Sequence, residues 1–372
     1  MNVIGIFLLV MLAFALLCGI TTPNNRMCRS YLDESFMGDG FVTQSVFVVV
    51  SFLALLFFRT FIDIESVPDL RPYSLAYSRI CEISLREVPL DSINDIKMPE
   101  IGFRLFMKIC SYISHSFVFF LFMFGVIWLN FYYRIILDYS PYVILSIVLF
   151  ALEIYSQSLY VLRQHMAMAI ALFSFPYIIN RDLKKFLFVI FCAFLFHQTA
   201  LVLLPLFFIY NIKTPGKLII FLFAVSIFLN FFFSIFFAYF GTNFFVGYKP
   251  YVDSMIRTNS TQMFIQIAYL LPYVYFLKNR VFDDGVNRFL FIVVCLSVLL
   301  NCFGIGFAPT SRLFMYYTMF TFLVVPVTVN FISSYSMKYV YICAVLGFNA
   351  YMSLFGSGSR SLEQVKIIFF GF

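Results

Sequence analysis

Two arginines stand at the starts of apolar segments. Arg163 lies in Leu-Arg-Gln-His-Met-Ala-Met-Ala-Ile, and Arg312 begins Arg-Leu-Phe-Met-Tyr-Tyr. A guanidinium group stays charged at any working pH, and its fork of N–H groups fits phosphate oxygens. The pair therefore favours binding of an anion, with the neighbouring Gln164 in a supporting role. The alternative is that each arginine extends to the membrane interface, as charged residues near helix ends do.

Three further titratable residues lie in or beside apolar segments. His197 stands deep inside one, Glu153 near the end of another, and Glu100 just before a third. An imidazole can take a proton from an attacking hydroxyl near neutral pH. A carboxylate at membrane depth is costly unless it has a partner, and arginine is the natural one. His197 and Glu100 are therefore candidate bases and Glu153 a candidate supporting residue. The alternative for His197 is a hydrogen-bonded packing role.

Motifs for cofactor chemistry are absent from the sequence. It contains no Gly-x-x-x-x-Gly-Lys phosphate loop, no Gly-x-Ser-x-Gly elbow, no His-Glu-x-x-His pair and no spaced His/Cys metal set. A single residue separates the acids Asp63 and Glu65. This spacing is too common to indicate a site for a metal-bound nucleotide. The eight cysteines include no Cys-x-x-Cys pair. We expect no metal, no nucleotide and no other cofactor.

The elements that must position these residues are predicted to be membrane helices. Of the 372 residues, 62% are hydrophobic and 12% are charged, whereas globular proteins are about 25% charged. Backbone groups in lipid must be bonded within their own segment, and barrel strands would show alternation, so helices are expected. The net charge of +7 is spread over short loops, which indicates topology signals rather than a nucleic acid partner.

We therefore expect an all-α polytopic integral membrane protein with about 10–12 transmembrane helices, forming a single domain over residues 1–372. The candidate spans are 3–20, 41–58, 116–133, 141–157, 160–179, 186–210, 218–240, 262–277, 289–304, 312–332 and 338–355.

Two segments decide the expected orientation. Residues 59–104 form one long polar stretch, expected to be an extracytoplasmic loop. Residues 186–210 are either one span or a re-entrant hairpin that turns near His197. The hairpin is favoured because it places the basic loops on both of its sides in the cytoplasm, as the positive-inside rule requires. A polar turn at membrane depth is tolerated where protein or a wet cavity surrounds it. The candidate residues then gather on the extracytoplasmic face.

These residues follow one another along the chain in an order similar to that of the motifs of a known protein family. Leu162 to Ile170, the basic loop from Asp182 to Phe186, and Phe196 to Leu201 with Pro205 follow an Arg-Gln-x-x-Ala, basic loop, Phe-His-x-(Ser/Thr)-Ala order. Further elements are Asp69 with Tyr73 and Tyr77, Pro99-Glu100-Ile101-Gly102-Phe103, and Arg312 with Tyr316 and Tyr317. Over about residues 69–317, the chain resembles the EpsG-like family of Wzy-type O-antigen and exopolysaccharide polymerases. It departs at Asp69-Leu-Arg-Pro-Tyr73, which contains a proline and lies in a longer loop.

The resemblance implies a GT-C-like, multi-pass glycosyltransferase of the bacterial inner membrane, independent of metal and nucleotide. It would join undecaprenyl-diphosphate-linked oligosaccharide repeats at the periplasmic face, in the synthesis of lipopolysaccharide, capsule or exopolysaccharide. A chain-length regulator and a flippase would be its protein partners.

The same resemblance gives the candidate residues roles. Arg163 and Arg312 would bind the diphosphate, whose charge increases as it leaves. His197 or Glu100 would accept the proton of the attacking hydroxyl. Residues in supporting roles would be Gln164, Glu153, Asp69, Tyr73 and Tyr316.

Three other functions compete with this one. A flippase or exporter of lipid-linked oligosaccharide would also use outward arginines, but it should show broken helices or related halves. A membrane acyltransferase that modifies the glycan could use His197 as base, but would need a thioester donor from the cytoplasm. A purely structural subunit explains the spans and leaves the arginines unexplained.

Overall fold

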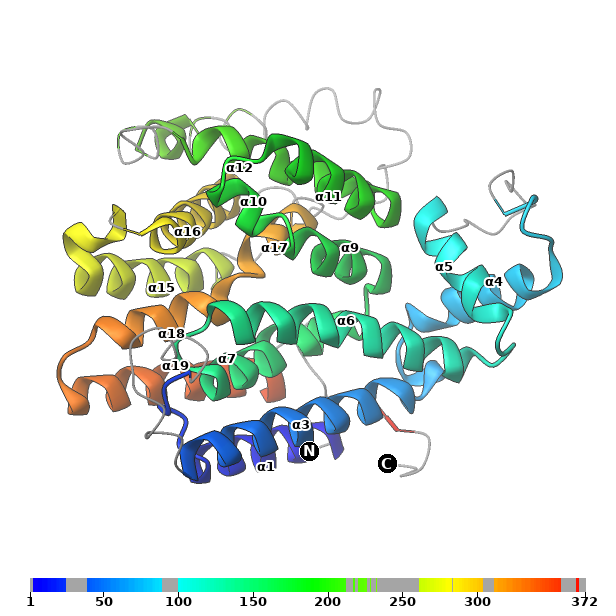
Figure 1. Cartoon of the computed structure of the whole chain (residues 1–372), viewed down its shortest axis with the longest axis horizontal. Helices are drawn as coiled ribbons and strands as arrows, with labels where there is room; N and C mark the ends of the chain where they lie inside the picture. Colours follow the sequence, from blue (N-terminus) through cyan, green and yellow to red (C-terminus); the bar gives the residue numbers. More distant parts are fainter. Residues whose placement is uncertain are drawn as a thin grey trace. The chain divides into compact units, whose positions relative to one another are not determined.

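The apolar segments form helices in the computed structural model, which describes residues 3–24, 39–88, 100–211, 217, 220–225, 228, 232, 261–282, 284–303, 311–355 and 366–367 (Figure 1). Within these ranges the β structure is limited to an isolated bridge between Ile62 and Ile367. The prediction of an all-α fold is therefore confirmed.

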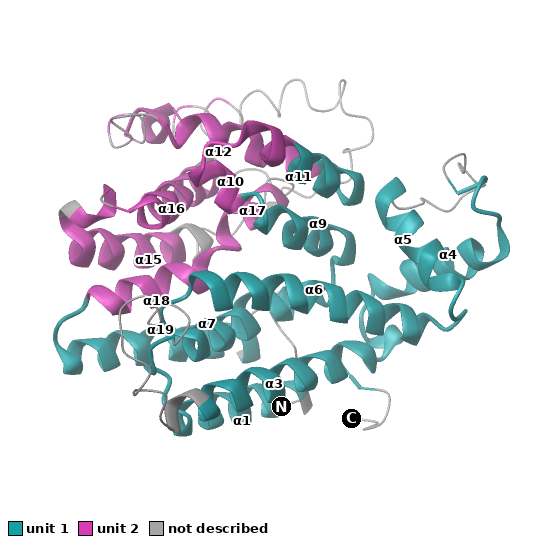
Figure 2. Ribbon diagram, viewed as in Figure 1, with its two compact units in different colours: residues 1–174, 188–198, 332–372 teal, residues 175–187, 199–331 magenta. Residues whose placement is uncertain are grey.

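The chain divides into two compact units (Figure 2). Unit 1 comprises residues 1–174, 188–198 and 332–372, and unit 2 comprises residues 175–187 and 199–331. The elements of unit 1 are α1 (Val3–Leu17), α3 (Asp39–Thr60), η2 (Ile64–Ser66), α4 (Leu70–Glu82), α5 (Ile101–Ser111), α6 (Phe117–Tyr139), α7 (Val143–Phe150), the π-helical turn η3 (Ala151–Tyr155), α8 (Ser156–Ser158), α9 (Leu162–Leu172) and α19 (Tyr335–Phe355).

Unit 2 begins at α10 (Phe175–Ile179) and contains most of the 3-10 turn η4 (Gln198–Leu203). Helix α11 (Leu183–Phe196) contributes residues to both units. The remaining elements of unit 2 are α12 (Leu204–Ile209), α15 (Thr261–Leu277), η6 (Lys278–Phe282), α16 (Gly285–Phe303), α17 (Ser311–Thr318) and α18 (Thr321–Phe331).

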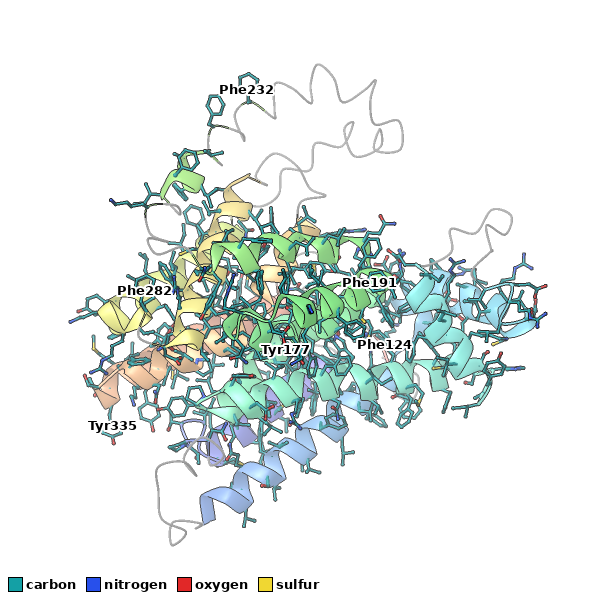
Figure 3. The ribbon with its side chains drawn as sticks, turned by 45° about the horizontal axis from the view of Figure 1, so that its top comes forward. Phe124, Tyr177, Phe191, Phe232, Phe282 and Tyr335 are labelled. Carbon is teal, nitrogen blue, oxygen red and sulfur yellow. The ribbon has the colours of Figure 1, made fainter. Side chains whose placement is uncertain are left out.

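Among the described residues, 4 stretches are long and apolar enough to cross a membrane: Val42–Thr60, Phe117–Tyr139, Gly285–Cys302 and Arg312–Phe331. Shorter apolar helices accompany them. Large aromatic side chains such as Phe191, Phe282 and Tyr335 project from the surface (Figure 3). Because water would oppose such exposure and lipid does not, these features fit a polytopic membrane protein.

Several predicted spans correspond to observed helices, but three of the described ones are broken. The predicted span 160–179 divides into α9 and α10, the span 312–332 into α17 and α18, and the span 186–210 into α11, η4 and α12. The stretch 59–104, predicted as a loop, contains the helix α4. Most of the predicted span 218–240 lies outside the described residues.

The segment 186–210 folds back on itself. Helix α11 ends at Phe196, and the chain continues through η4 into α12. The rings of Phe186 and Phe207, both in unit 2, lie 5.1 Å apart. In one straight helix these residues would be separated by about 30 Å, at 1.5 Å per residue. Arg181 reinforces the contact by donating a hydrogen bond to the carbonyl of Phe207. The chain therefore has the hairpin geometry, with its turn at His197.

A buried arginine ties together the helices of unit 1. Arg59 is 0% exposed at the end of α3, and its Nη2 donates to the carbonyl of Ser158 at 2.7 Å. The guanidinium carbon lies 4.7 Å from the ring centroid of Phe124 and 5.8 Å from that of Trp128. Trp128 in turn donates its Nε1 to the carbonyl of His165 at 3.0 Å. Helices α3 and α6 thus hold both sides of the break between α8 and α9.

Candidate active site

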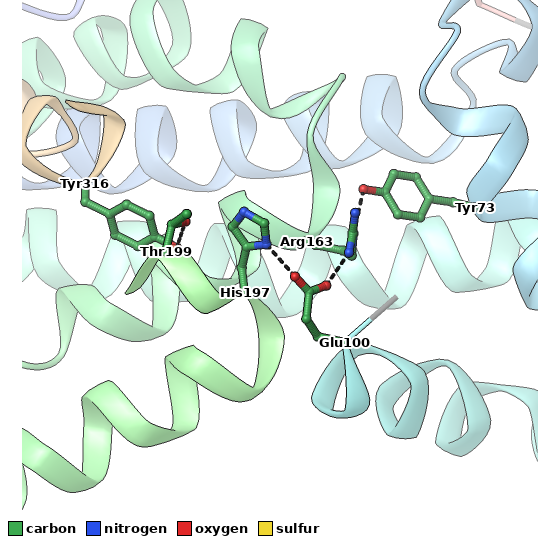
Figure 4. A network of polar contacts seen from close by, with 6 residues as sticks. All are labelled: Tyr73, Glu100, Arg163, His197, Thr199 and Tyr316. Carbon is green, nitrogen blue, oxygen red and sulfur yellow. Dashed lines mark hydrogen bonds and ion pairs between the residues drawn. The ribbon is translucent and has the colours of Figure 1, made fainter. Parts of the chain in front are cut away.

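Four predicted site residues from separate elements of unit 1 form one polar cluster, drawn in Figure 4. The Oε1 of Glu100 lies 2.7 Å from the Nδ1 of His197. Its Oε2 pairs with the Nη1 of Arg163. The Nε of Arg163 donates to the hydroxyl of Tyr73 at 3.1 Å. We call Tyr73, Glu100, Arg163 and His197 the site cluster.

The position of Glu100 depends on a close approach of two helices. Glu100 is the N-cap residue of α5 and has an extended ψ of 153°. Two residues later, a Cβ added to Gly102 would lie 2.7 Å from the carbonyl oxygen of Leu195 and 2.9 Å from its Cβ. A side chain at position 102 would therefore force α5 and α11 apart. Glycine lets the start of α5 rest on α11 close to His197, where the helix ends.

Arg163 enters the cluster because the helix breaks before it. Helix α8 ends at Ser158 and α9 begins at Leu162, so Arg163 occupies the first turn of α9. The carbonyl of Ser158 is held by Arg59, as described above. This break, secured on the α8 side by Arg59, allows the side chain of Arg163 to reach Glu100 and Tyr73.

The electrostatics of the cluster favour an ionised carboxylate. Burial raises the pKa of Glu100, but the hydrogen bond from His197 and the positive charge of Arg163 outweigh it, so the pKa falls from 4.5 to about 2. A carboxylate with so low a pKa is a weak base at neutral pH. Glu100 is consequently better suited to orient a neighbour than to take a proton itself.

His197 presents one nitrogen to the carboxylate and keeps the other available. Because an ionised carboxylate can only accept, Nδ1 must be the donor, and a neutral imidazole then carries its lone pair on Nε2. The Nε2 atom is buried and has no hydrogen-bond partner in the described part of the chain. The whole side chain is 12% exposed. An oriented imidazole with an unpartnered Nε2 has the arrangement of a general base.

The remaining predicted residues of unit 1 lie as follows. Gln164 is fully buried in α9, one residue after Arg163. Glu153 is buried in the π-helical turn η3. Asp69 is exposed at the N-cap of α4 and makes no side-chain hydrogen bond that caps the helix. Pro99, which precedes Glu100, lies outside the described residues. The roles proposed for these residues stay predictions.

Unit 2 brings together two of the motif elements read from the sequence. Tyr316 of α17 is buried, and its hydroxyl accepts a hydrogen bond from Thr199 at 3.4 Å (Figure 4). The neighbouring Tyr317 donates to the carbonyl of Val202 at 2.6 Å. Helix α17 is thereby fastened to η4. Arg312 is exposed in the first turn of α17, and its role as an anion ligand stays a prediction.

Sequence reasoning missed the residues that support the cluster. Arg59 and Trp128 were not singled out, because a basic residue at the end of an apolar helix and an aromatic residue within one are both ordinary. The available signal was that apolar residues stand on both sides of Arg59, Phe58 just before it and Phe61 soon after, and a cation in such surroundings requires partners. Within the described residues, no group of three or more His, Cys, Asp or Glu side chains could hold a metal ion.

Comparison with known proteins gives one family. The model of the EpsG family matches residues 45–365, which include the whole site cluster and Arg312. No curated protein and no solved structure matches the chain.

Proposed function

Because the chain belongs to the EpsG family, a family of membrane proteins of polysaccharide synthesis, we propose that it polymerises lipid-linked oligosaccharide repeats. Its substrates would be repeat units carried on undecaprenyl diphosphate, and its site would face the periplasm from the bacterial inner membrane. A chain-length regulator and a flippase would act beside it. The observation that carries the proposal is the hydrogen-bonded pair of Glu100 and His197 with a buried, unpartnered Nε2.

The reaction is a glycosyl transfer. A hydroxyl of the incoming repeat attacks the anomeric carbon of the growing glycan, and a new glycosidic C–O bond forms. The bond between that carbon and the diphosphate oxygen breaks, and the lipid diphosphate leaves with the electron pair. The hydroxyl proton passes to the Nε2 of His197. The carbohydrate donor is already activated by its diphosphate, so the step needs no further co-reactant.

Each member of the site cluster has a part in this step. Glu100 holds the imidazole through Nδ1 and stabilises the imidazolium that forms when Nε2 takes the proton. Arg163 is fixed through Nε and Nη1 by Tyr73 and Glu100. Its Nη2 makes no hydrogen bond within the described chain and is the donor proposed for a diphosphate oxygen. Placing a cation where charge develops lowers the barrier to departure of the diphosphate.

Arg312 is proposed as a second cation for the diphosphate. Support comes from its place in the first turn of α17 and from the sequence pattern Arg312, Tyr316, Tyr317 described above. Its exposed side chain is accessible to a ligand that approaches unit 2. It should tolerate lysine poorly if its planar fork binds two diphosphate oxygens at once.

Incubation of the purified protein with a synthetic lipid-diphosphate repeat unit tests the proposal. A polymerase produces a ladder of glycans that differ by one repeat, resolved by gel electrophoresis or mass spectrometry. A flippase leaves the glycan length unchanged while moving it across a vesicle membrane. An acyltransferase supplied with a thioester donor adds the mass of an acyl group. Absence of any ladder from well-folded protein, with either of the other outcomes, would refute polymerisation.

A further inference from the structure

Helix α5 and the turn that follows it carry a stripe of exposed apolar side chains. Ile109, Tyr112 and Ile113 are 60%, 66% and 67% exposed, and Leu105 lies one turn earlier on the same side, partly exposed. Tyr112 is the C-cap residue of α5 with helical φ and ψ of −69° and −21°, and Ile113 lies in the turn that follows, where its N–H still donates to the carbonyl of Cys110. If 100° per residue is continued through this turn, the four positions fall within about 100° of the helix circumference. An apolar stripe of this width normally packs against protein or contacts lipid. We call Leu105, Ile109, Tyr112 and Ile113 the α5 stripe.

The other face of α5 joins it firmly to α4. Lys108 is buried, and its Nζ donates to the carbonyls of Ile80 at 3.1 Å and Ile83 at 2.7 Å, which satisfies the end of α4. The rings of Tyr73 and Phe103 lie 5.6 Å apart between the two helices. Helices α4 and α5 therefore form one tightly packed pair, which we call the α4–α5 pair.

The outward face of α4 differs in character from the α5 stripe. Its exposed residues include Arg71, Ser78, Arg79 and Glu82, with Leu75 among them. Arg71 has a side chain that is 69% exposed and lies 3.7 Å from Glu65. One helix of the pair thus presents an apolar surface, and the other presents a charged surface that contains two arginines.

The α4–α5 pair is placed at the beginning of a membrane span. Tyr77 of α4 donates to the carbonyl of Ser114, and its ring lies 6.0 Å from that of Phe117, the first residue of α6. Phe103 of α5 packs edge-on against Phe120 in the first turn of α6. Helix α6 is long and apolar enough to span the bilayer. With 11 residues, α5 is about 16 Å long and cannot do so.

From these observations we propose that the α4–α5 pair lies in the membrane–water interface, with the α5 stripe in contact with acyl chains and the charged face of α4 at the headgroups. Interfacial helices have this division of faces, and tyrosine is favoured at this depth. The guanidinium groups on the charged face of α4 can pair with the phosphates of lipid headgroups. In this placement the acyl chains of the bilayer cover the α5 stripe.

This placement has a consequence that rests on the proposed function. The α4–α5 pair supplies Tyr73 and Glu100 to the site cluster. If the pair lies in the interface, the cluster sits near the depth of lipid phosphates. A lipid diphosphate could then reach Arg163 without leaving the headgroup layer. The location of the pair does not itself depend on the reaction that the protein catalyses.

Depth-dependent fluorescence quenching tests the location. The chain has 1 tryptophan, Trp128, which is buried and gives a constant background. The Ile113→Trp variant is reconstituted in liposomes that contain lipids brominated on the acyl chains, and Ser78→Trp on the charged face of α4 is the matched control. We expect quenching of the added emission to be roughly twofold or more stronger at position 113 than at position 78.

The quenching experiment tests the location of the α4–α5 pair whether or not the protein is a polymerase, because quenching is measured without substrate. Gel filtration of both variants checks that each is folded. Acrylamide, a quencher dissolved in water, should show the opposite order of efficiencies. Equal bromine quenching at the two positions, or strong acrylamide quenching at position 113, would overturn the interfacial placement. Protection of position 113 from both quenchers would also overturn it, since protein would then cover the stripe.

Discussion

Arg59 and Arg163, two arginines of unit 1, have opposite surroundings. The side chain of Arg163 is 26% exposed and pairs with a carboxylate and a tyrosine hydroxyl. Arg59 is 0% exposed, lies over two aromatic rings and donates to one backbone carbonyl. Its Nε and Nη1 have no hydrogen-bond partner within the described residues. One cation is neutralised and accessible to a ligand, whereas the other is enclosed. The difference separates a residue suited to binding from one suited to holding the helices that position it.

The largest expected effect is at His197, whose Nε2 is the proposed proton acceptor. His197→Gln keeps a hydrogen-bonding side chain of similar size but cannot take the proton at neutral pH. Polymer formation should fall by a factor of about 100 to 10,000, as for loss of a general base. The rate of ladder growth by purified protein gives the measurement.

The matched control is a substitution of His115, which is exposed and lies beyond the end of α5. His115→Gln should form polymer at the normal rate. Near-normal polymer from His197→Gln, with poorly folded His197→Ala, would assign His197 to packing instead.

The two arginines should then respond differently to the same substitution. Arg163→Lys keeps the charge but loses the fork, and we expect a roughly 100-fold loss of activity at normal protein abundance. Arg59→Lys should instead reduce the amount of folded protein in the membrane, because a compact ammonium cannot cover both rings and reach Ser158. Gel filtration of fluorescent fusions and activity per folded molecule separate the two effects. Equal loss of abundance in both variants would remove the distinction drawn between them.

Gly102 should have a smaller effect that acts through position. Gly102→Ala brings a methyl group against the backbone of Leu195 and displaces Glu100 from His197. Because misplacement by about 1 Å can cost up to about 100-fold, we expect a loss of roughly 10-fold or more in kcat. Gly347→Ala is the control, since an added Cβ there meets no atom within 4 Å.

A third glycine distinguishes positioning from general packing. At Gly285, in unit 2, an added Cβ would lie 2.8 Å from Ile179 Cγ2 and 3.1 Å from the hydroxyl of Tyr210, none of them a residue of the site cluster. Gly285→Ala should lower thermal stability and leave kcat per folded molecule unchanged. A normal kcat for Gly102→Ala would show that the close approach of α5 and α11 does not set the geometry of the cluster.

The smallest effect concerns pH and stability. The pKa of Glu100 falls from 4.5 to about 2 on folding, so its ionised form stabilises the native state. That contribution is complete above about pH 5 and is lost as pH falls from 4.5 towards 2. The stability difference between the wild type and Glu100→Gln should therefore be constant from pH 8 to about pH 5 and shrink below about pH 4. Thermal unfolding at several pH values measures it, and a difference that shrinks already between pH 8 and 6 would contradict the lowered pKa.

The sequence was sufficient to predict the class of fold and to name the four residues that the structure brings together as the site cluster. Apolar runs specify helices in lipid because no other partner exists for their backbone groups. The polar turn at His197 and the basic residues around it predicted the hairpin geometry between Phe186 and Phe207. The candidates Glu100, Arg163 and His197 were chosen because ionisable groups in apolar surroundings require partners.

The pairing within the site could not be read in the same way. Glu100 lies 97 positions from His197 in the chain and 63 from Arg163, and composition does not specify which carboxylate meets which cation. Helix α4 was missed because a search for continuous apolar runs passes over an amphipathic helix. Its buried side is carried by Leu70, Tyr73, Ala76, Tyr77 and Ile80, a helical spacing that was present in the sequence. Arg59 was missed because its role depends on rings supplied by another helix.

A double-mutant cycle on Glu100 and His197 tests the central claim most directly, namely that the two residues act together as an oriented base. Ladder growth is measured for the wild type, Glu100→Gln, His197→Gln and the variant that carries both substitutions. Because residues that act as one unit are strongly non-additive, we expect the double variant to be no slower than His197→Gln alone. If the two losses instead multiply, Glu100 and His197 contribute independently, and the proposed base is not oriented by Glu100.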